Sequence, residues 1–254
     1  MKILIYGNAR TRSTYLIDIL AKHYDCPNLF EPYHRKITDK LDKTLNFYER
    51  DKKYELYLQE TKKVTEHLKK LPKFAVKLFP DALYNFYKYP TDTNKYKDIK
   101  KSDCLPFIET FNIQMYDLIF ATTRNNTTDW LCSFLTAQRE DMFLFKNEKE
   151  ARFYAPRNTK LKYTKSFMEG MAFSNIFFEI NFKVLKKFYP NIIRLDYDEI
   201  PSYVQDNFSG IKTSLIDTKY NYKKLITNYS QIEKDFEQAR IDIEEEKIIK
   251  LLSE

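Results

Sequence analysis

Residues 2–15, with the sequence KILIYGNARTRSTY, decide how the rest of the chain is interpreted. A short apolar run stops at Gly7, and from Arg12 onward a segment begins in which apolar residues recur with helical spacing. This pattern predicts a strand, a tight loop and the N-terminus of a helix. The first turn of a helix has unpaired backbone N–H groups and about half a positive charge, which together suit an oxyanion such as phosphate.

The predicted loop is rich in cationic and hydroxyl side chains: Arg10, Thr11, Arg12, Ser13 and Thr14. It resembles a nucleotide P-loop, G-x-x-x-x-G-K-[ST], in the spacing from Gly7 to Thr14. However, Arg12 stands at the position of the second Gly, and Ser13 stands at that of the Lys. The loop alone leaves two interpretations open, an anion-binding loop and a well-capped helix start in an α/β domain.

A second unit of the same kind spans residues 116–138, YDLIFATTRNNTTDWLCSFLTAQ. It predicts a strand that ends at Arg124, a polar loop over 125–128, and a helix with Asp129 in its first turn and Ser133 further along. This strand does not end in a Walker-B-type Asp. Its basic end argues against the binding of Mg²⁺ at this position and for the binding of a second anion. Two basic strand-loop-helix units suit a ligand with two phosphate groups.

Length and composition are those of one globular α/β domain. The chain has 254 residues, 43% hydrophobic content and a net charge of +7, which suits an anionic ligand. No nucleic-acid motif is present, so we expect no nucleic-acid partner. Cysteine and histidine are sparse and scattered, which argues against a disulfide framework and a structural zinc site. With no signal-peptide pattern and no apolar run of membrane length, we expect a cytoplasmic protein without a membrane partner.

Residues 27–34 and 74–80 are further candidate strands. The first leads to Glu31 and His34, which are candidate general bases. The alternative is that Glu31 caps a helix or pairs with a Lys, and that His34 is a surface residue. Lys77 interrupts the second strand, and it fits either an edge strand with one solvated face or a charge directed into a site.

The remaining segments complete a single domain over residues 1–254. Amphipathic periodicity predicts helices at about 12–24 and within 36–71, and an apolar helix over 166–188. Residues 192–197 are another candidate strand, and the tail ends in a charged helix. The basic segment 139–165 fits a surface loop better than a mobile lid.

Taken in order, these motifs resemble those of the PAPS-dependent sulfotransferases, enzymes that use 3'-phosphoadenosine 5'-phosphosulfate. Residues 7–16, GNARTRSTYL, resemble the 5'-phosphosulfate loop, P-[RK]-[ST]-G-[ST]-[ST]. Residues 124–133 resemble the 3'-phosphate motif, R-[ND]-P-x-D followed by a helical Ser. FEPYH at 30–34 is similar to the E-P segment of carbohydrate sulfotransferases, and IIRLDYDEI at 192–200 is similar to a late strand of the family.

The chain departs from these motifs at several positions. Arg12 replaces the usual loop Gly, Ala9 replaces the usual loop Pro, and Asn126 replaces the Pro of the second motif. The second motif is one residue longer than the common pattern, so Cys132 competes with Ser133 for the place of the helical Ser.

The resemblance implies a three-layer P-loop-NTPase-like α/β fold with a central, mainly parallel sheet flanked by helices. It also implies PAPS as co-substrate, no metal ion, and a set of residues that bind the nucleotide: Ala9, Arg10, Thr11, Arg12, Ser13, Thr14, Tyr15, Arg124, Ser133 and Lys219. The implied catalytic residues are Glu31 as base with His34 in reserve, Arg10 at the leaving group, and Lys77 near the transferred group.

Two other functions remain open from the sequence, namely a P-loop kinase or NTPase and a nucleotide-binding module without catalysis. The E-P segment favours a sugar hydroxyl as acceptor, although a different small hydroxyl or amine compound also fits. The sequence leaves the oligomeric state open.

Overall fold

The computed structural model describes residues 1–33, 50–79, 111–139, 156–213 and 220–243. Within these ranges the strands form one four-stranded sheet of β1 (Lys2–Gly7), β2 (Phe74–Leu78), β3 (Leu118–Thr123) and β4 (Ile193–Asp196). The strand order is β2-β1-β3-β4, and every neighbouring pair is parallel. The expected α/β class with a central parallel sheet is therefore confirmed.

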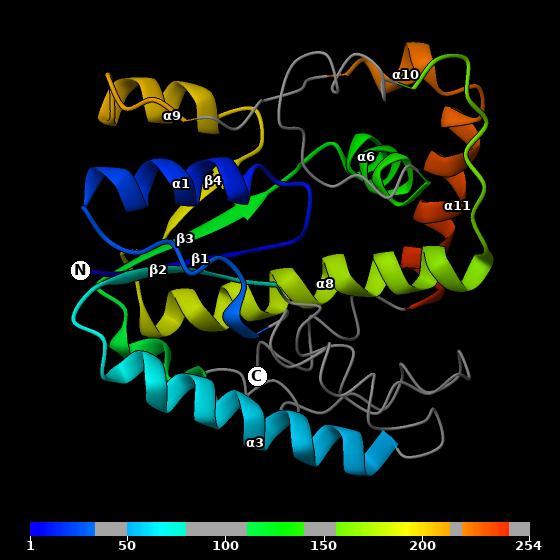
Figure 1. The fold of residues 1–254 in the computed structure, drawn as a ribbon. Helices are drawn as coiled ribbons and strands as arrows, with labels where there is room; N and C mark the ends of the chain where they lie inside the picture. Colours follow the sequence, from blue (N-terminus) through cyan, green and yellow to red (C-terminus); the bar gives the residue numbers. More distant parts are fainter. Residues whose placement is uncertain (34–49, 80–110, 140–155, 214–219, 244–254) are drawn as a thin grey trace.

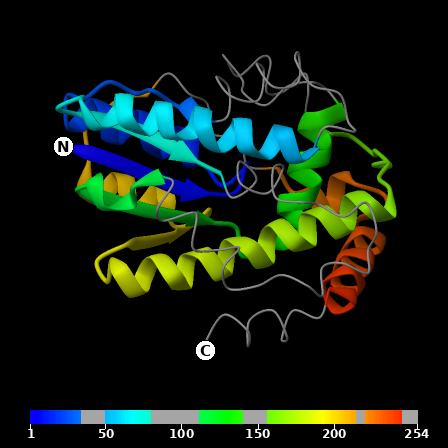
Figure 2. The same ribbon diagram turned by 90° about the horizontal axis from the view of Figure 1, so that it is seen from below.

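Helices cover both faces of the sheet (Figure 1). One face is packed by α1 (Ser13–His23) and α9 (Ile200–Asn207). The other face is packed by α3, α6, α8 and α11. In Figure 2, where the molecule is seen from below, α3 and α8 run across this face. Their bounds, with those of the short helices α10 and η2, are Arg50–Lys69 (α3), Thr127–Arg139 (α6), Lys165–Phe188 (α8), Tyr229–Asp242 (α11), Tyr222–Leu225 (α10) and Ile113–Met115 (η2).

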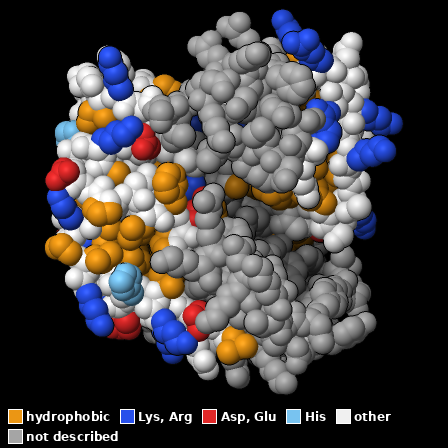
Figure 3. Space-filling model, viewed as in Figure 1, with side chains coloured by type: hydrophobic (Ala, Val, Ile, Leu, Met, Phe, Trp, Pro, Cys, Tyr) orange, Lys and Arg blue, Asp and Glu red, His pale blue; other side chains and the backbone are white. Residues whose placement is uncertain are grey.

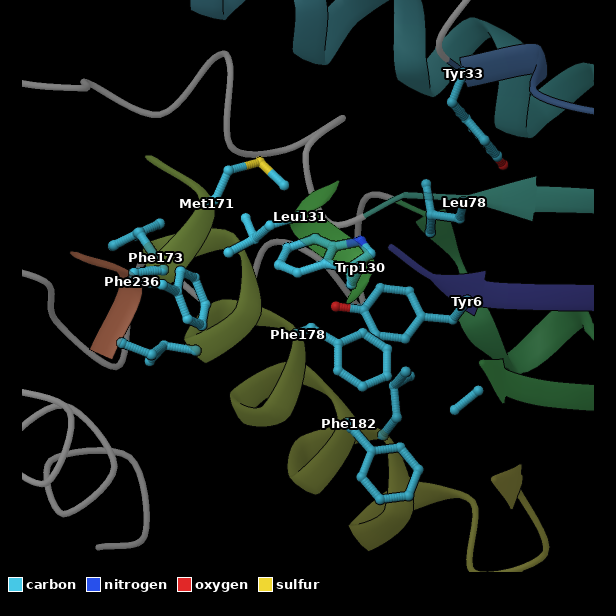
Figure 4. Packing of buried hydrophobic residues seen from close by; sticks show 14 of the residues in the cluster. Tyr6, Tyr33, Leu78, Trp130, Leu131, Met171, Phe173, Phe178, Phe182 and Phe236 are labelled. Carbon is cyan, nitrogen blue, oxygen red and sulfur yellow. The ribbon is translucent and has the colours of Figure 1, made fainter. Parts of the chain in front are cut away.

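Each face has its own hydrophobic core because side chains alternate along a strand. In β1, Ile3 and Ile5 point toward α1, whereas Leu4 and Tyr6 point toward α8. Tyr6 stacks on Phe178 of α8 with ring centroids 5.1 Å apart, as Figure 4 shows. A strand that is buried on both faces needs apolar residues at every position, and residues 3–6 of β1 accordingly have the sequence ILIY.

The topology places two loops at one end of the sheet. From β1 the chain passes to β2 on one side and later to β3 on the other, so the crevice between β1 and β3 is a topological switch point. Ligands of open α/β sheets bind outside the carboxyl ends of the strands at such a point. In Figure 1 both the β1–α1 loop and the β3–α6 loop leave the sheet at this end.

Gly7 makes the close approach of these two strands possible. It pairs with Thr122 of β3, and a Cβ atom at position 7 would lie 2.2 Å from Thr122 Oγ1 and 2.6 Å from the Thr122 carbonyl oxygen. These separations are far below van der Waals contact, so any side chain at position 7 would push the strands apart.

Several expected elements appear with small changes of extent. The helix predicted over 12–24 is α1, the helix predicted over 166–188 is α8, and the strand predicted over 192–197 is β4. Residues 27–30 run alongside β2 as an isolated bridge, with Leu29 N donating to Ala75 O at 2.9 Å. None of the helices in the described ranges is both long and apolar enough to span a bilayer.

Candidate functional site

The β1–α1 loop is held in an unusual backbone conformation. Arg10 and Arg12 have φ angles of 66° and 59°, in the left-handed region that glycine adopts most easily. Arg12 stands where a P-loop has its second Gly, so the loop keeps that conformation at a cost of roughly 1–3 kcal/mol per residue. Thr11 fixes the loop, because its hydroxyl donates to Asn8 O at 2.7 Å and lies 2.8 Å from Thr122 Oγ1.

Arg12 directs its side chain toward the end of β4. Its guanidinium carbon lies 3.7 Å from the centroid of the Tyr197 ring, and Nη1 donates to Tyr197 O at 2.5 Å. This cation–π contact and hydrogen bond fasten the loop to the neighbouring strand. Arg12 is therefore placed to bind an anion through its backbone N–H at the start of α1, where no side chain caps the helix.

Arg10 joins the two loops that the sequence separates by more than a hundred residues. Its Nε donates to Ser133 Oγ at 3.0 Å, on the helix that follows Arg124. Burial lowers the pKa of Arg10, and the positive charge of Arg124 lowers it further, whereas Tyr222 and Tyr197 act in the opposite direction. The turn that carries Arg10 and the turn that carries Arg124 therefore meet at the same edge of the sheet.

Arg124 is buried beside the same tyrosines. Its guanidinium carbon lies 4.1 Å from the Tyr197 ring centroid and 5.7 Å from that of Tyr222. Its Nη2 lies 3.8 Å from Asp129 Oδ2, and the other oxygen of Asp129 accepts a hydrogen bond of 3.0 Å from Tyr229. Aromatic faces and one longer ion pair hold Arg124 in position without fully neutralising its charge.

The competition between Ser133 and Cys132 is decided by geometry. Ser133 faces the loop and accepts from Arg10, whereas Cys132 packs in the hydrophobic core beneath the sheet. Burial raises the pKa of the Cys132 thiol to about 12, so the thiol stays neutral. Of the two, only Ser133 is placed to contact a ligand between Arg10 and Arg124.

Tyr222 completes this cluster, which we call the two-arginine site (Arg10, Arg124, Ser133, Tyr197 and Tyr222). The Tyr222 hydroxyl hydrogen-bonds with Ser133, and burial raises its pKa to about 12 although both arginines oppose the shift. Sequence reasoning missed Tyr197 and Tyr222. Tyr197 had a detectable signal, because it directly follows β4 at the ligand-binding edge of the sheet, whereas no local pattern marked Tyr222.

Lys77 and Glu31 form a second polar group on the other side of β1. Lys77 Nζ lies 2.7 Å from Glu31 Oε1 and donates to Thr14 Oγ1 at 2.6 Å. β2 is an edge strand of the described sheet, but the side chain of Lys77 is only 3% exposed, so the alternative with a solvated face is wrong. The ammonium group of Lys77 points toward the first turn of α1, where it meets Thr14. A hydrogen bond of 2.6 Å from Lys77 N to Phe30 O places Glu31 beside it.

The other predicted residues have varied surroundings. The Ala9 carbonyl accepts a hydrogen bond of 2.8 Å from Trp130 Nε1, which ties α6 to the first loop. Ser13 is buried and Tyr15 packs against the core on the α1 face. His34 and Lys219 lie outside the described residues.

In the described part of the chain, no three or more His, Cys, Asp or Glu side chains gather in a way that suits a metal ion. No family model, curated protein or solved structure matches the chain.

Proposed function

We propose that this protein transfers a sulfuryl group from PAPS to a hydroxyl or amine acceptor and releases adenosine 3',5'-bisphosphate (PAP). The observation that carries the proposal is the meeting of two basic turns, in which Arg10 Nε bonds to Ser133 Oγ at 3.0 Å beside Arg124. Two guanidinium groups and a helix N-terminus at one edge of a parallel sheet suit a ligand with phosphate groups at two positions.

In this proposal the β1–α1 loop holds the 5'-phosphosulfate end of PAPS. The backbone N–H groups of residues 10–15, with the Ser13 and Thr14 side chains, contact the 5'-phosphate, as in a P-loop-NTPase-like fold. Arg10 stabilises the negative charge that grows on the bridging oxygen of the leaving group. Preorganised charge of this kind is often worth about 3–4 kcal/mol per donor in the transition state.

The 3'-phosphate is assigned to Arg124 and Ser133. Arg124 presents a planar fork of donors that matches phosphate oxygens, and the Tyr197 ring beneath it restricts its orientation. Tyr222 remains protonated at neutral pH, so its hydroxyl can hold Ser133 in place through their hydrogen bond. Lys219, which the resemblance also implies for the nucleotide, stays a prediction.

The chemical step uses Glu31 and Lys77. Glu31 takes the proton of the acceptor as the acceptor oxygen or nitrogen bonds to sulfur, and the bond from sulfur to the bridging phosphate oxygen breaks. Lys77 lies between Glu31 and Thr14 at the first turn of α1, so its ammonium group faces both the base and the transferred group. No metal ion is required, because Arg10, Lys77 and Arg124 supply the positive charge.

Calorimetric titration with PAP tests the donor site without knowledge of the acceptor. We expect PAP to bind more tightly than adenosine 5'-monophosphate by at least about tenfold, because the 3'-phosphate adds charge-assisted hydrogen bonds. Arg124→Gln should remove this preference, whereas Arg139→Gln, at the C-terminal end of α6, should keep it. Binding of ATP with Mg²⁺ but not of PAP would contradict the proposal and favour a kinase or NTPase.

A further inference from the structure

Residues 159–163 run along the outer edge of the molecule, beside α10 and α11, before the chain enters α8 (Figure 1). Thr159 pairs with Ile226 in a parallel bridge. Thr159 N donates to Leu225 O at 3.0 Å, and Thr227 N donates to Thr159 O at 2.9 Å. The chain that follows α10 therefore holds one side of this segment.

The same side of the segment is held again two residues later. Leu161 N donates to Asn228 Oδ1 and Leu161 O accepts from Asn228 Nδ2, both at 3.0 Å, so an amide side chain here takes the place of a neighbouring strand. Leu161 is buried, whereas Lys160 and Lys162 on either side of it are exposed. This alternation is that of a strand with one face in the core.

The opposite side of the segment is an open edge. Successive residues of an extended chain direct their backbone N–H and C=O groups to alternate sides, so those of Lys160 and Lys162 point away from residues 225–228. They form no hydrogen bond with the part of the chain that the structure describes. Such an edge is a template for a further strand. Its alternating donors and acceptors match another peptide backbone, whereas the phosphate or sulfate groups of a polyanion only accept.

The surroundings of this edge are basic. Neither residues 156–165 nor residues 220–230 contain an Asp or Glu. Figure 3 shows Lys and Arg side chains along the edge of the molecule that α10 and α11 form. The basic strip, as we call it, consists of the cations in these two segments that are exposed and form no ion pair within the described ranges: Arg157, Lys160, Lys162, Lys223 and Lys224.

Two carboxylates next to the basic strip have partners of their own. Glu169 pairs with Lys165 at 3.7 Å. Asp235 accepts a hydrogen bond of 2.8 Å from Tyr163 through one oxygen and a hydrogen bond of 2.7 Å from Gln231 through the other. The basic strip is therefore complementary in charge to an acidic partner.

We propose that the open edge and the basic strip together bind an acidic, extended segment of a partner protein by strand addition. The backbone of that segment pairs with the N–H and C=O groups of Lys160 and Lys162, and its carboxylates face the cations of the strip. The backbone pairing supplies affinity, and the charges select acidic segments. The proposal goes beyond sulfuryl transfer and does not depend on it, because no residue of the basic strip belongs to the two-arginine site or to the Glu31–Lys77 pair.

A peptide of alternating Glu and Thr, about ten residues long, is a suitable probe, because Thr favours strands and the alternation places every carboxylate on one face. Fluorescence anisotropy of the labelled peptide with the full chain measures its binding. The double variant Lys160→Glu/Lys162→Glu should weaken binding by about tenfold or more, because it replaces attraction by repulsion at the open edge.

The matched control is Lys183→Glu/Lys187→Glu, which changes the net charge equally at two exposed positions in the C-terminal part of α8. It should leave the affinity within about twofold, because exposed charges far from the strip are screened by salt. Equal weakening by the two double variants would overturn the proposal, and so would a failure of the unmutated protein to bind the peptide.

Amide hydrogen exchange of the unmutated protein, followed by nuclear magnetic resonance, separates strand addition from binding by charge alone. Saturating peptide should slow exchange at Lys160 and Lys162 by about tenfold, because their N–H groups gain partners. The amide of Lys224, which already bonds to Asn221, is the reference and should not change. Unchanged exchange at Lys160 and Lys162 would overturn the proposal. Tighter binding of a single-stranded oligonucleotide of the same charge would also overturn it, since that polymer has no peptide backbone to pair with the edge.

Discussion

At the scale of single residues, like charges lie close together in this protein. Arg124 is buried and Arg10 is partly buried, and the positive charge of Arg124 adds to desolvation in lowering the pKa of Arg10. The rings of Tyr197 and Tyr222 stabilise Arg124 through cation–π contacts, beside one longer ion pair with Asp129. Such a preorganised cationic cluster costs stability in the free protein and regains it when an anion binds.

Glu31→Gln tests the assignment of the base. The amide cannot accept the acceptor's proton, so kcat for sulfation should fall by about 10²–10⁴-fold. The affinity for PAP should stay within a few-fold, because Glu31 faces Lys77 and lies outside the two-arginine site. Near-normal turnover of the true acceptor by this variant would show that another group, such as His34, takes the proton.

Tyr222→Phe tests the positioning of Ser133. Removal of the hydroxyl breaks its hydrogen bond to Ser133, so PAP affinity should fall by about 3–10-fold, the equivalent of one net hydrogen bond. The affinity for adenosine 5'-monophosphate, which lacks the 3'-phosphate, should not change. Tyr163→Phe is the control, because its hydroxyl bonds to Asp235 instead. If Tyr222→Phe weakens both nucleotides equally, Tyr222 has only a structural role.

At the scale of elements, the site depends on how closely β1 and β3 approach. The loops that follow them carry Arg10 and Arg124, and two contacts tie these loops together: the Thr11–Thr122 hydroxyl pair and the Trp130–Ala9 hydrogen bond. Gly7 allows the strands to approach, because it has no side chain that would meet Thr122. These contacts fix the separation of the two arginines before any ligand arrives, which reduces the entropy that binding must overcome.

Gly7→Ala is expected to disturb both the fold and the site. The new methyl group would meet the Thr122 hydroxyl and carbonyl oxygens, so the free energy of unfolding should fall by about 1–3 kcal/mol. Urea denaturation followed by circular dichroism measures this change. Thr122→Ala should not restore stability to Gly7→Ala, since the carbonyl oxygen at 2.6 Å stays in place. Full recovery in the double variant would mean that the hydroxyl alone sets the strand separation.

At the scale of the whole molecule, the described surface is basic and the sheet is covered on both faces. Figure 3 shows Lys and Arg side chains along the edge that α10 and α11 form, and Lys223 and Lys224 belong to α10. The excess positive charge favours the approach of anionic ligands to the carboxyl edge of the sheet. It also makes that approach sensitive to ionic strength.

Stability should decrease in alkaline solution. Burial raises the pKa of Cys132 from 9.0 to about 12 and that of Tyr222 from 10.0 to about 12. The unfolded chain therefore loses these protons first, and stability is full below about pH 9 and declines as the pH rises to 12. Urea midpoints measured across this range check the trend. In Cys132→Ala the decline should begin nearer pH 10, and an unchanged onset would contradict the assignment.

The sequence by itself determined the order of the strands and helices along the chain and the two strand-loop-helix units. These follow from local signals, namely the periodicity of apolar residues and the glycine, arginine and hydroxyl residues that mark the two loops. Only the tertiary structure decided that Arg10 meets Ser133 rather than Cys132, that Lys77 is buried beside Glu31, and that Tyr197 and Tyr222 flank both arginines. These contacts join residues up to two hundred positions apart, and they depend on strand order and on side-chain direction, which no local pattern specifies.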